Sequence, residues 1–206
     1  MQIYKEISIL TNRPSIKDEK ITKHHLYGFC SVKNIFSAGH WLNEVTKIIR
    51  TKRDENKTLI IVGGTGLYFK ALTEGLAKVP EIPNNVREKI IKLHNEVGQK
   101  IFFKKLIKLD PLAKNFILGT DSQRSIRAYQ VKIFTNKSLF QLIKKTKANF
   151  DLRNFKKIFI NTPRELLKKT IENRVENMLK EGAIEEVEKF IKLKIPNELS
   201  ANKIIG

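Results

Sequence analysis

The stretch IIVGGTGLYF, residues 60–69, has the glycines and the hydroxyl from which ligand-binding turns are built. A Walker phosphate-binding loop needs a lysine for the phosphates and a hydroxyl directly after it for magnesium, and this stretch has neither. A dinucleotide-binding turn needs a third glycine, whose place Phe69 takes. Both nucleotide sites are therefore excluded. Thr65 remains at the carboxyl end of an apolar strand, where open α/β sheets bind ligands. The alternative is a turn whose glycines only let helix pack on strand.

The stretch TDSQRSIRAYQVK, residues 120–132, contains side chains that can bind RNA. Gln123 and Arg127 are four positions apart and Arg124 and Arg127 are three apart, so all three share a helix face. Glutamine and arginine can fork onto base edges and phosphates. Asp121 or Thr120 can cap this helix, and Asp121 suits the positive end of its dipole. The alternative is an ordinary solvated basic face.

Other chemistry has weaker support. His24 and His25 are adjacent and cannot face one ligand from a regular element, and Cys30 is the single cysteine, so no zinc site is expected. No hydrolase-type serine motif occurs, and no Cys/His pattern surrounds Cys30. Arg174 lies one position off an apolar helical stripe and could meet a phosphate. More often such an arginine is a surface charge.

The net charge of +19, from 40 Lys and Arg against 21 Asp and Glu, points to a polyanionic partner. An AT-rich genome that favours lysine codons is a competing cause. Residues 101–150 alone carry 11 Lys and Arg and 2 Asp and Glu, and a codon bias would spread the excess more evenly. No signal peptide and no spanning segment is apparent, so a cytoplasmic protein is expected, with no membrane partner.

The elements that must position these residues follow an α/β order. Residues 37–52 have helical periodicity with Ser37 as N-cap, and residues 57–64 and 157–161 are expected as buried strands. Between them, residues 83–98, 99–110, 110–118 and 120–134 are expected as short amphipathic helices. Thr162 to Glu165 forms a sequence-level capping box, and Gly182 should end the helix that follows. A layered α/β fold is expected.

Several stretches in order resemble one family, the tRNA dimethylallyltransferases (tRNA isopentenyltransferases). They are MQIYK, HHLYGF, FSAGHW, IIVGGTGLYFKALTEGL, DSQRSIRAYQV, RELLKKTIENRVENMLKEGAIEEV and SANKIIG. The resemblance covers essentially the whole chain. It implies a P-loop-NTPase-like parallel-sheet core from residues 1–79 and 151–206, and a basic, all-helical, tRNA-binding insertion at residues 80–150.

The resemblance also implies an activity and a set of site residues. Members transfer a dimethylallyl group from dimethylallyl diphosphate to the exocyclic amine of the adenosine 3′ of the tRNA anticodon, with Mg²⁺ as cofactor. Thr65 would lie in the reaction channel, and Arg174 would meet the diphosphate. The implied tRNA contacts are Met1, Gln2, Arg87, Gln123, Arg124, Ser125, Ile126 and Arg127.

The sequence departs from the family pattern in ways that affect activity. The family's P-loop, with its Mg²⁺ ligand, and the Asp of its D-S-M-Q motif would precede Met1, and its basic C-terminal segment would follow Gly206. Thr170 replaces the first arginine of the R-I-x-x-R pattern. A chain truncated at both ends is therefore expected, with little activity unless a separately encoded N-terminal fragment joins it. The alternatives are a non-catalytic RNA-binding remnant and a decayed reading frame that does not fold.

Overall fold

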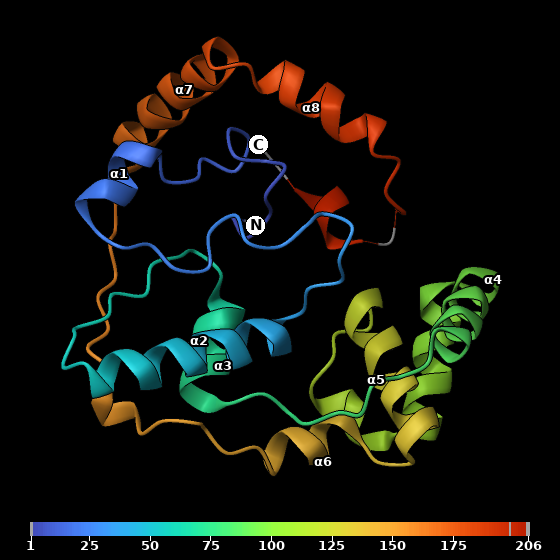
Figure 1. Ribbon diagram of the computed structural model, residues 1–206. Coiled ribbons are helices and arrows are strands. Elements are labelled where there is room, and N and C mark those ends of the chain that lie inside the picture. The colour runs from blue at the N-terminus through green and yellow to red at the C-terminus, as the bar shows by residue number, and fades with distance from the viewer. Residues whose placement is uncertain (1, 198, 205–206) are drawn as a thin grey trace. The chain divides into compact units, whose positions relative to one another are not determined.

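The chain divides into two compact units in the computed structural model, which describes residues 2–197 and 199–204 (Figure 1). The split unit comprises Met1–Tyr68 and Arg153–Gly206, and the central unit comprises Phe69–Leu152. The elements, in order, are α1 (Ile16–Ile21), α2 (Ala38–Asp54), α3 (Gly66–Glu74), α4 (Asn84–Leu109), η1 (Pro111–Asn115), α5 (Ser122–Thr135), α6 (Leu139–Lys144), η2 (Leu152–Asn154), α7 (Arg164–Lys180), α8 (Ala183–Lys192) and η3 (Ser200–Lys203).

The expected parallel-sheet core is wrong. Among residues 2–197 and 199–204, the only β-pairing is one isolated parallel bridge between Tyr4 and Cys30. Residues 57–63 and 155–163, where the two strands were expected, belong to no helix or strand and form no ladder. Their side chains lie in solvent instead: Ile60 is 84% exposed and Phe159 is 90% exposed. The P-loop-like α/β assignment is therefore replaced by a mainly helical architecture.

The reason for this error is that extended conformation and sheet formation depend on different information. A run of β-branched residues favours an extended backbone locally. A sheet also needs partner strands whose N–H and C=O groups meet its own, and these come from distant parts of a chain. Among the described residues neither segment pairs with another strand in a β-ladder, so the two runs form no sheet.

Helix ends follow local side-chain chemistry closely. Ser37 caps α2 and Asp121 caps α5, as predicted, each accepting a hydrogen bond from a backbone N–H of the first turn. Gly182 follows α7 with φ +96°, a left-handed conformation that favours glycine, and this also confirms a prediction. The capping box at Thr162 is wrong, because Pro163 occupies the N-cap of α7 and no side chain caps it.

The split unit is built around a small apolar cluster next to its N-terminal segment. Its buried members are Ile3, Tyr4, Ile7, Cys30, Val32 and Ala201. Helix α2 buries Trp41, Leu42 and Val45, and Trp41 stacks on Tyr68 with ring centroids 4.7 Å apart. Helix α7 is less well covered, since Met178 is its one buried residue.

Glu186 of α8 fixes the N-terminal segment of the split unit. Its Oε1 accepts hydrogen bonds from Ser8 N (2.7 Å), Ser8 Oγ (3.0 Å) and Ile9 N (3.0 Å), and its Oε2 accepts one from Leu10 N (2.9 Å). Burial alone raises the pKa of Glu186, but these hydrogen bonds lower it by more, so the net shift is downward. The carboxylate therefore holds residues 8–10 as an anion.

The central unit is a packed set of helices around α4 and α5. Its core cluster contains Leu106, Ala113, Ile117 and Ala128. The two short helices expected at residues 83–98 and 99–110 are joined as α4, but Gly98 breaks the helical geometry between them with φ +72°. Gln99, just after this break, donates hydrogen bonds to Gly119 O (2.8 Å) and to Ser125 Oγ (3.1 Å). Those bonds tie the second half of α4 to the start of α5.

No helix within the described residues is long and apolar enough to cross a membrane.

Candidate nucleic-acid interface

The N-terminal turn of α5 presents Gln123 and Arg124 to solvent. Asp121 Oδ1 accepts a hydrogen bond from Arg124 N at 3.0 Å, and its Oδ2 pairs with Arg124 Nη1 at 3.3 Å. The Arg124 side chain is nevertheless 72% exposed. Such an exposed pair adds little stability and can open at low cost when a phosphate competes for the guanidinium.

Arg87 of α4 and Arg127 of α5 lie close enough for their charges to interact. Arg127 reaches solvent, but protein atoms displace part of the water around its guanidinium and so lower the pKa of Arg127. The positive charge of Arg87 lowers this pKa further. Neither arginine forms an ion pair with any residue that the structure describes, and Arg87 Nε is buried with no hydrogen-bond partner. Two adjacent cations without an acidic partner are suited to bind an anion.

Two other members of the 123–127 segment occupy different environments. Ser125 is fully buried: its Oγ donates to Asp121 O at 2.6 Å and accepts from Gln99. It supports the first turn of α5 from the inside. Ile126 is half-buried. The structure therefore places Arg127 beside the half-buried Arg87 and leaves Gln123 and Arg124 exposed in the first turn of the same helix, α5.

The glycine turn before α3 is open to solvent. Thr65 is exposed, and its carbonyl accepts a hydrogen bond from Tyr68 N at 3.1 Å, so the residue starts α3. A Cβ atom added at Gly64 or Gly66 would meet no atom within 4 Å. Contacts within the chain therefore do not require glycine at these two positions, and the space beside Thr65 is available to a ligand.

The remaining sequence-predicted residues are in the split unit. Met1 lies outside the described residues. Gln2 is half-buried, and its Nε2 donates to Asn12 O at 2.7 Å, so its amide is partly engaged within the chain. Arg174 is exposed on α7. No contact joins Gln2 or Arg174 to Thr65 among the hydrogen bonds and ion pairs of the described residues.

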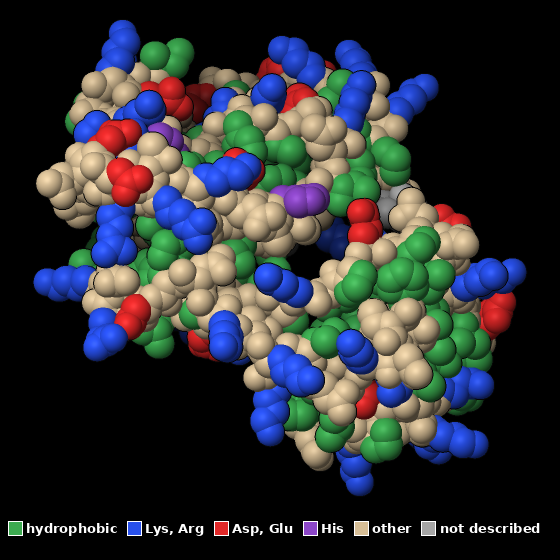
Figure 2. Space-filling model, turned by 60° about the horizontal axis from the view of Figure 1, so that its bottom comes forward, with side chains coloured by type: hydrophobic (Ala, Val, Ile, Leu, Met, Phe, Trp, Pro, Cys, Tyr) green, Lys and Arg blue, Asp and Glu red, His purple; other side chains and the backbone are tan. Residues whose placement is uncertain are grey.

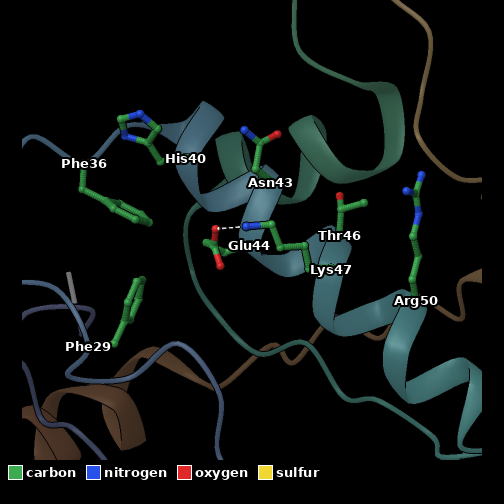
Figure 3. A pocket seen from close by; sticks show the side chains of 8 residues that line it. All are labelled: Phe29, Phe36, His40, Asn43, Glu44, Thr46, Lys47 and Arg50. Atoms are coloured by element: carbon green, nitrogen blue, oxygen red, sulfur yellow. Dashed lines mark hydrogen bonds and ion pairs between the residues drawn. The ribbon is translucent and has the colours of Figure 1, made fainter.

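A cavity that the sequence did not suggest lies in the split unit, beside α2 (Figure 3). Its volume is about 530 Å³. Phe29 and Phe36 line one side, and His40, Asn43, Glu44, Thr46, Lys47 and Arg50 of α2 complete it. The signal that could have indicated this cavity is the polar face of α2. The sequence analysis used only the apolar face of this helix, which packs into the core.

Positive charge is spread widely over the surface. The face in Figure 2 shows many more Lys and Arg side chains (blue) than Asp and Glu side chains (red). This distribution agrees with the excess of 19 positive charges in the sequence. Such a surface attracts polyanions and makes their binding depend on salt.

The described residues offer no group of three or more His, Cys, Asp or Glu side chains that could hold a metal ion. Asp110 is buried with one carboxylate oxygen lacking a hydrogen-bond partner, but a single carboxylate does not make a magnesium site. The expected Mg²⁺ is therefore not matched by these residues.

Comparison with known proteins identifies a family. A family model described as IPP transferase matches residues 2–206. The chain is 48% identical, over its whole length, to a tRNA dimethylallyltransferase of Pelagibacter ubique (strain HTCC1062) and covers 66% of that protein. It is 40% identical to the enzyme of the same name from Ehrlichia canis (strain Jake) and covers 68% of it. The chain thus spans about two thirds of the length of these relatives.

Solved structures share its fold. A eukaryotic dimethylallyltransferase acting on tRNA superimposes with a TM-score of 0.74 at 21% identity, over 97% of this chain and 50% of its own. The full-length tRNA isopentenylpyrophosphate transferase of Bacillus halodurans gives a TM-score of 0.59 at 24% identity, over 98% of this chain and 62% of its own.

Proposed function

Because this chain belongs to the IPP transferase family, we propose that it acts in tRNA modification as part of a tRNA dimethylallyltransferase. In the proposed reaction the exocyclic amine of the adenosine 3′ of the anticodon forms a bond to C1 of dimethylallyl diphosphate. The bond from C1 to the diphosphate oxygen breaks, and the amine loses a proton. The adenine must leave its base stack to be reached. Since tRNA is the substrate, we expect the protein in the cytoplasm.

The observation that carries this proposal is the pair formed by Arg87 and Arg127. The resemblance nominates both as tRNA contacts, and helical spacing also nominates Arg127. The two residues come from different helices of the central unit. A bound phosphate would relieve their mutual repulsion. We therefore assign the basic helical segment at residues 80–150 to tRNA binding, with Gln123 and Arg124 beside the pair.

The remaining roles follow from the resemblance. Thr65 would line the channel that receives the flipped adenine, which the open space beside Gly64 and Gly66 supports. Met1 and Gln2 would contact the same base, and Arg174 would meet the diphosphate. The resemblance puts the P-loop, the Mg²⁺ ligand and the general base outside these 206 residues.

Binding of tRNA is tested by measuring the dissociation constant at several salt concentrations. Arg87→Gln and Arg127→Gln should each weaken binding and lower the slope of log affinity against log salt by about one. Lys89→Gln is the matched control: it removes one charge from an exposed residue of α4, two positions from Arg87 and therefore on another face. If the slope of log affinity against log salt were equal for all three variants, Arg87 and Arg127 would not be part of the tRNA interface.

Catalysis is tested by incorporation of labelled dimethylallyl groups into tRNA, with this chain alone and with a co-expressed N-terminal segment of a relative. Incorporation only when the N-terminal segment is co-expressed would support both tRNA binding and catalysis by this chain. Salt-dependent tRNA binding without incorporation in either case would favour the alternative, a non-catalytic RNA-binding protein. Absence of tRNA binding would contradict both.

A further inference from the structure

The cavity beside α2 has two walls of different chemistry. Its polar wall is one face of α2, on which His40, Asn43, Lys47 and Arg50 follow each other at intervals of three or four residues. Its other wall is aromatic and includes Phe29, with Phe36 next to it (Figure 3). The volume of about 530 Å³ lies within the range of roughly 300–1,000 Å³ that is usual for small-molecule sites.

The aromatic wall is suited to stacking. The rings of Phe29 and Phe36 meet edge to face, with centroids 5.5 Å apart and planes at 81°. Phe36 also packs against the apolar cluster of the split unit, so it is anchored. Phe29 is 38% exposed and offers ring surface to the cavity. Any nucleic-acid base can stack on such a ring, because all four bases have an aromatic face.

The polar wall offers hydrogen bonds and charge. Asn43 is exposed and carries both donor and acceptor groups, which is what the edge of a base requires. His40 Nδ1 accepts from Ser37 N at 3.4 Å, so in the neutral ring Nε2 carries the proton and is left as a donor. Lys47 pairs with Glu44 at 2.7 Å, whereas Arg50 is exposed and has no ion pair among the described residues.

We propose that this cavity binds one nucleotide of a single-stranded RNA segment, with the base stacked on Phe29, its edge at Asn43 and a phosphate at Arg50. The ring of Phe29 matches the face of a base, the amide of Asn43 matches its edge, and the guanidinium of Arg50 matches a phosphate. The inference rests on the proposed function, because the RNA is then tRNA and the nucleotide is one other than the adenosine at Thr65.

The site is tested by cross-linking. A synthetic tRNA anticodon stem-loop is prepared in versions with 4-thiouridine at single loop and flanking positions, bound to the wild-type chain and irradiated. At least one version should cross-link to the peptide that contains Phe29 or to the peptide that contains Arg50, as read by mass spectrometry. Cross-links confined to other peptides would overturn the proposal.

Affinity supplies a second readout. Phe29→Leu keeps an apolar side chain but removes the ring, and should weaken stem-loop binding about three- to tenfold. Phe159→Leu, the same change at a residue of the same unit that is 90% exposed and does not line the cavity, should leave binding unchanged. Unchanged circular dichroism would show that both variants fold.

Charge is tested with a pair of variants on α2. Arg50→Gln should lower the salt slope by about one, whereas Arg53→Gln, an exposed arginine of the same helix outside the cavity, should not. If the wild type binds the stem-loop but Phe29→Leu and Arg50→Gln behave like their controls, the cavity is not an RNA site and the proposed function stands. If the wild type does not bind the stem-loop, the proposed function itself fails, and this inference with it.

Discussion

The carboxylate of Glu186 joins α8 to the N-terminal segment, so its removal should be costly. Glu186→Gln replaces an anion that accepts four hydrogen bonds by an amide that accepts fewer and binds them less strongly. We expect the free energy of unfolding at neutral pH to fall by about 1–3 kcal/mol. Urea denaturation measures this change. Glu188→Gln, at an exposed position of the same helix, should change it by less than about 0.5 kcal/mol.

The same residue predicts a pH dependence. Its pKa is lower in the folded chain than its ordinary value of 4.5, so its contribution is complete above that pH and is lost as the pH falls toward the folded pKa. The free energy of unfolding of the wild type should therefore decrease below pH 4.5 more steeply than that of Glu186→Gln. Parallel pH profiles would show that the hydrogen bonds do not favour the charged form.

Two glycines should respond differently to alanine. At Gly75, φ is +91° and a Cβ would lie 2.5 Å from Lys147 O, so Gly75→Ala should lower the free energy of unfolding by about 1–3 kcal/mol. At Gly64 a Cβ meets nothing, so Gly64→Ala should leave stability nearly unchanged. Thermal unfolding measures both. A large loss at Gly64 would mean that the turn is more constrained than its surroundings indicate.

Single residues also show how far the sequence could lead to the site. Gln123, Arg124 and Arg127 were recognisable because their spacing on one helix is visible in the sequence. The approach of Arg87 to Arg127 depends on how α4 packs on α5, and no local pattern contains that information. Phe29 and Arg50 were missed for the same reason, since the cavity between them forms only when a loop folds back beside α2.

Helix α5 depends on its N-cap, and this is testable at the level of the element. Asp121→Ala removes the acceptor for Arg124 N and should lower the free energy of unfolding by about 0.5–2 kcal/mol. Asp121→Asn keeps an acceptor oxygen and should lose much less. Chemical denaturation compares the two. If both variants lost the same amount, the charge of Asp121 would matter more than its hydrogen bond.

Elements differed in how well the sequence predicted them. The N-caps at Ser37 and Asp121 and the stop at Gly182 were predicted correctly, because capping is a contact between residues close in the chain. The sheet was wrong, because strand pairing is a contact between residues far apart. The box at Thr162 failed because Pro163 itself took the cap position.

For the molecule as a whole, the exposed apolar segments predict a tendency to aggregate. Ile158, Phe159 and Ile160 are 79%, 90% and 84% exposed in a segment that belongs to no helix or strand among the described residues. Ile160→Lys should slow aggregation, measured by light scattering, with little change in unfolding free energy. Ile21→Lys makes the same change at a residue that is equally exposed, at 84%, but lies on helix α1, and should slow aggregation less. If Ile21→Lys slowed aggregation more than Ile160→Lys, residues 158–160 would not be the main cause of aggregation.

The break at Gly98 separates the part of α4 that carries Arg87 from the part that packs against α5, which carries Arg127. The φ of +72° at Gly98 is a conformation that L side chains rarely adopt, so the relative direction of the two halves of α4, and with it the position of Arg87, depends on a glycine at this one residue.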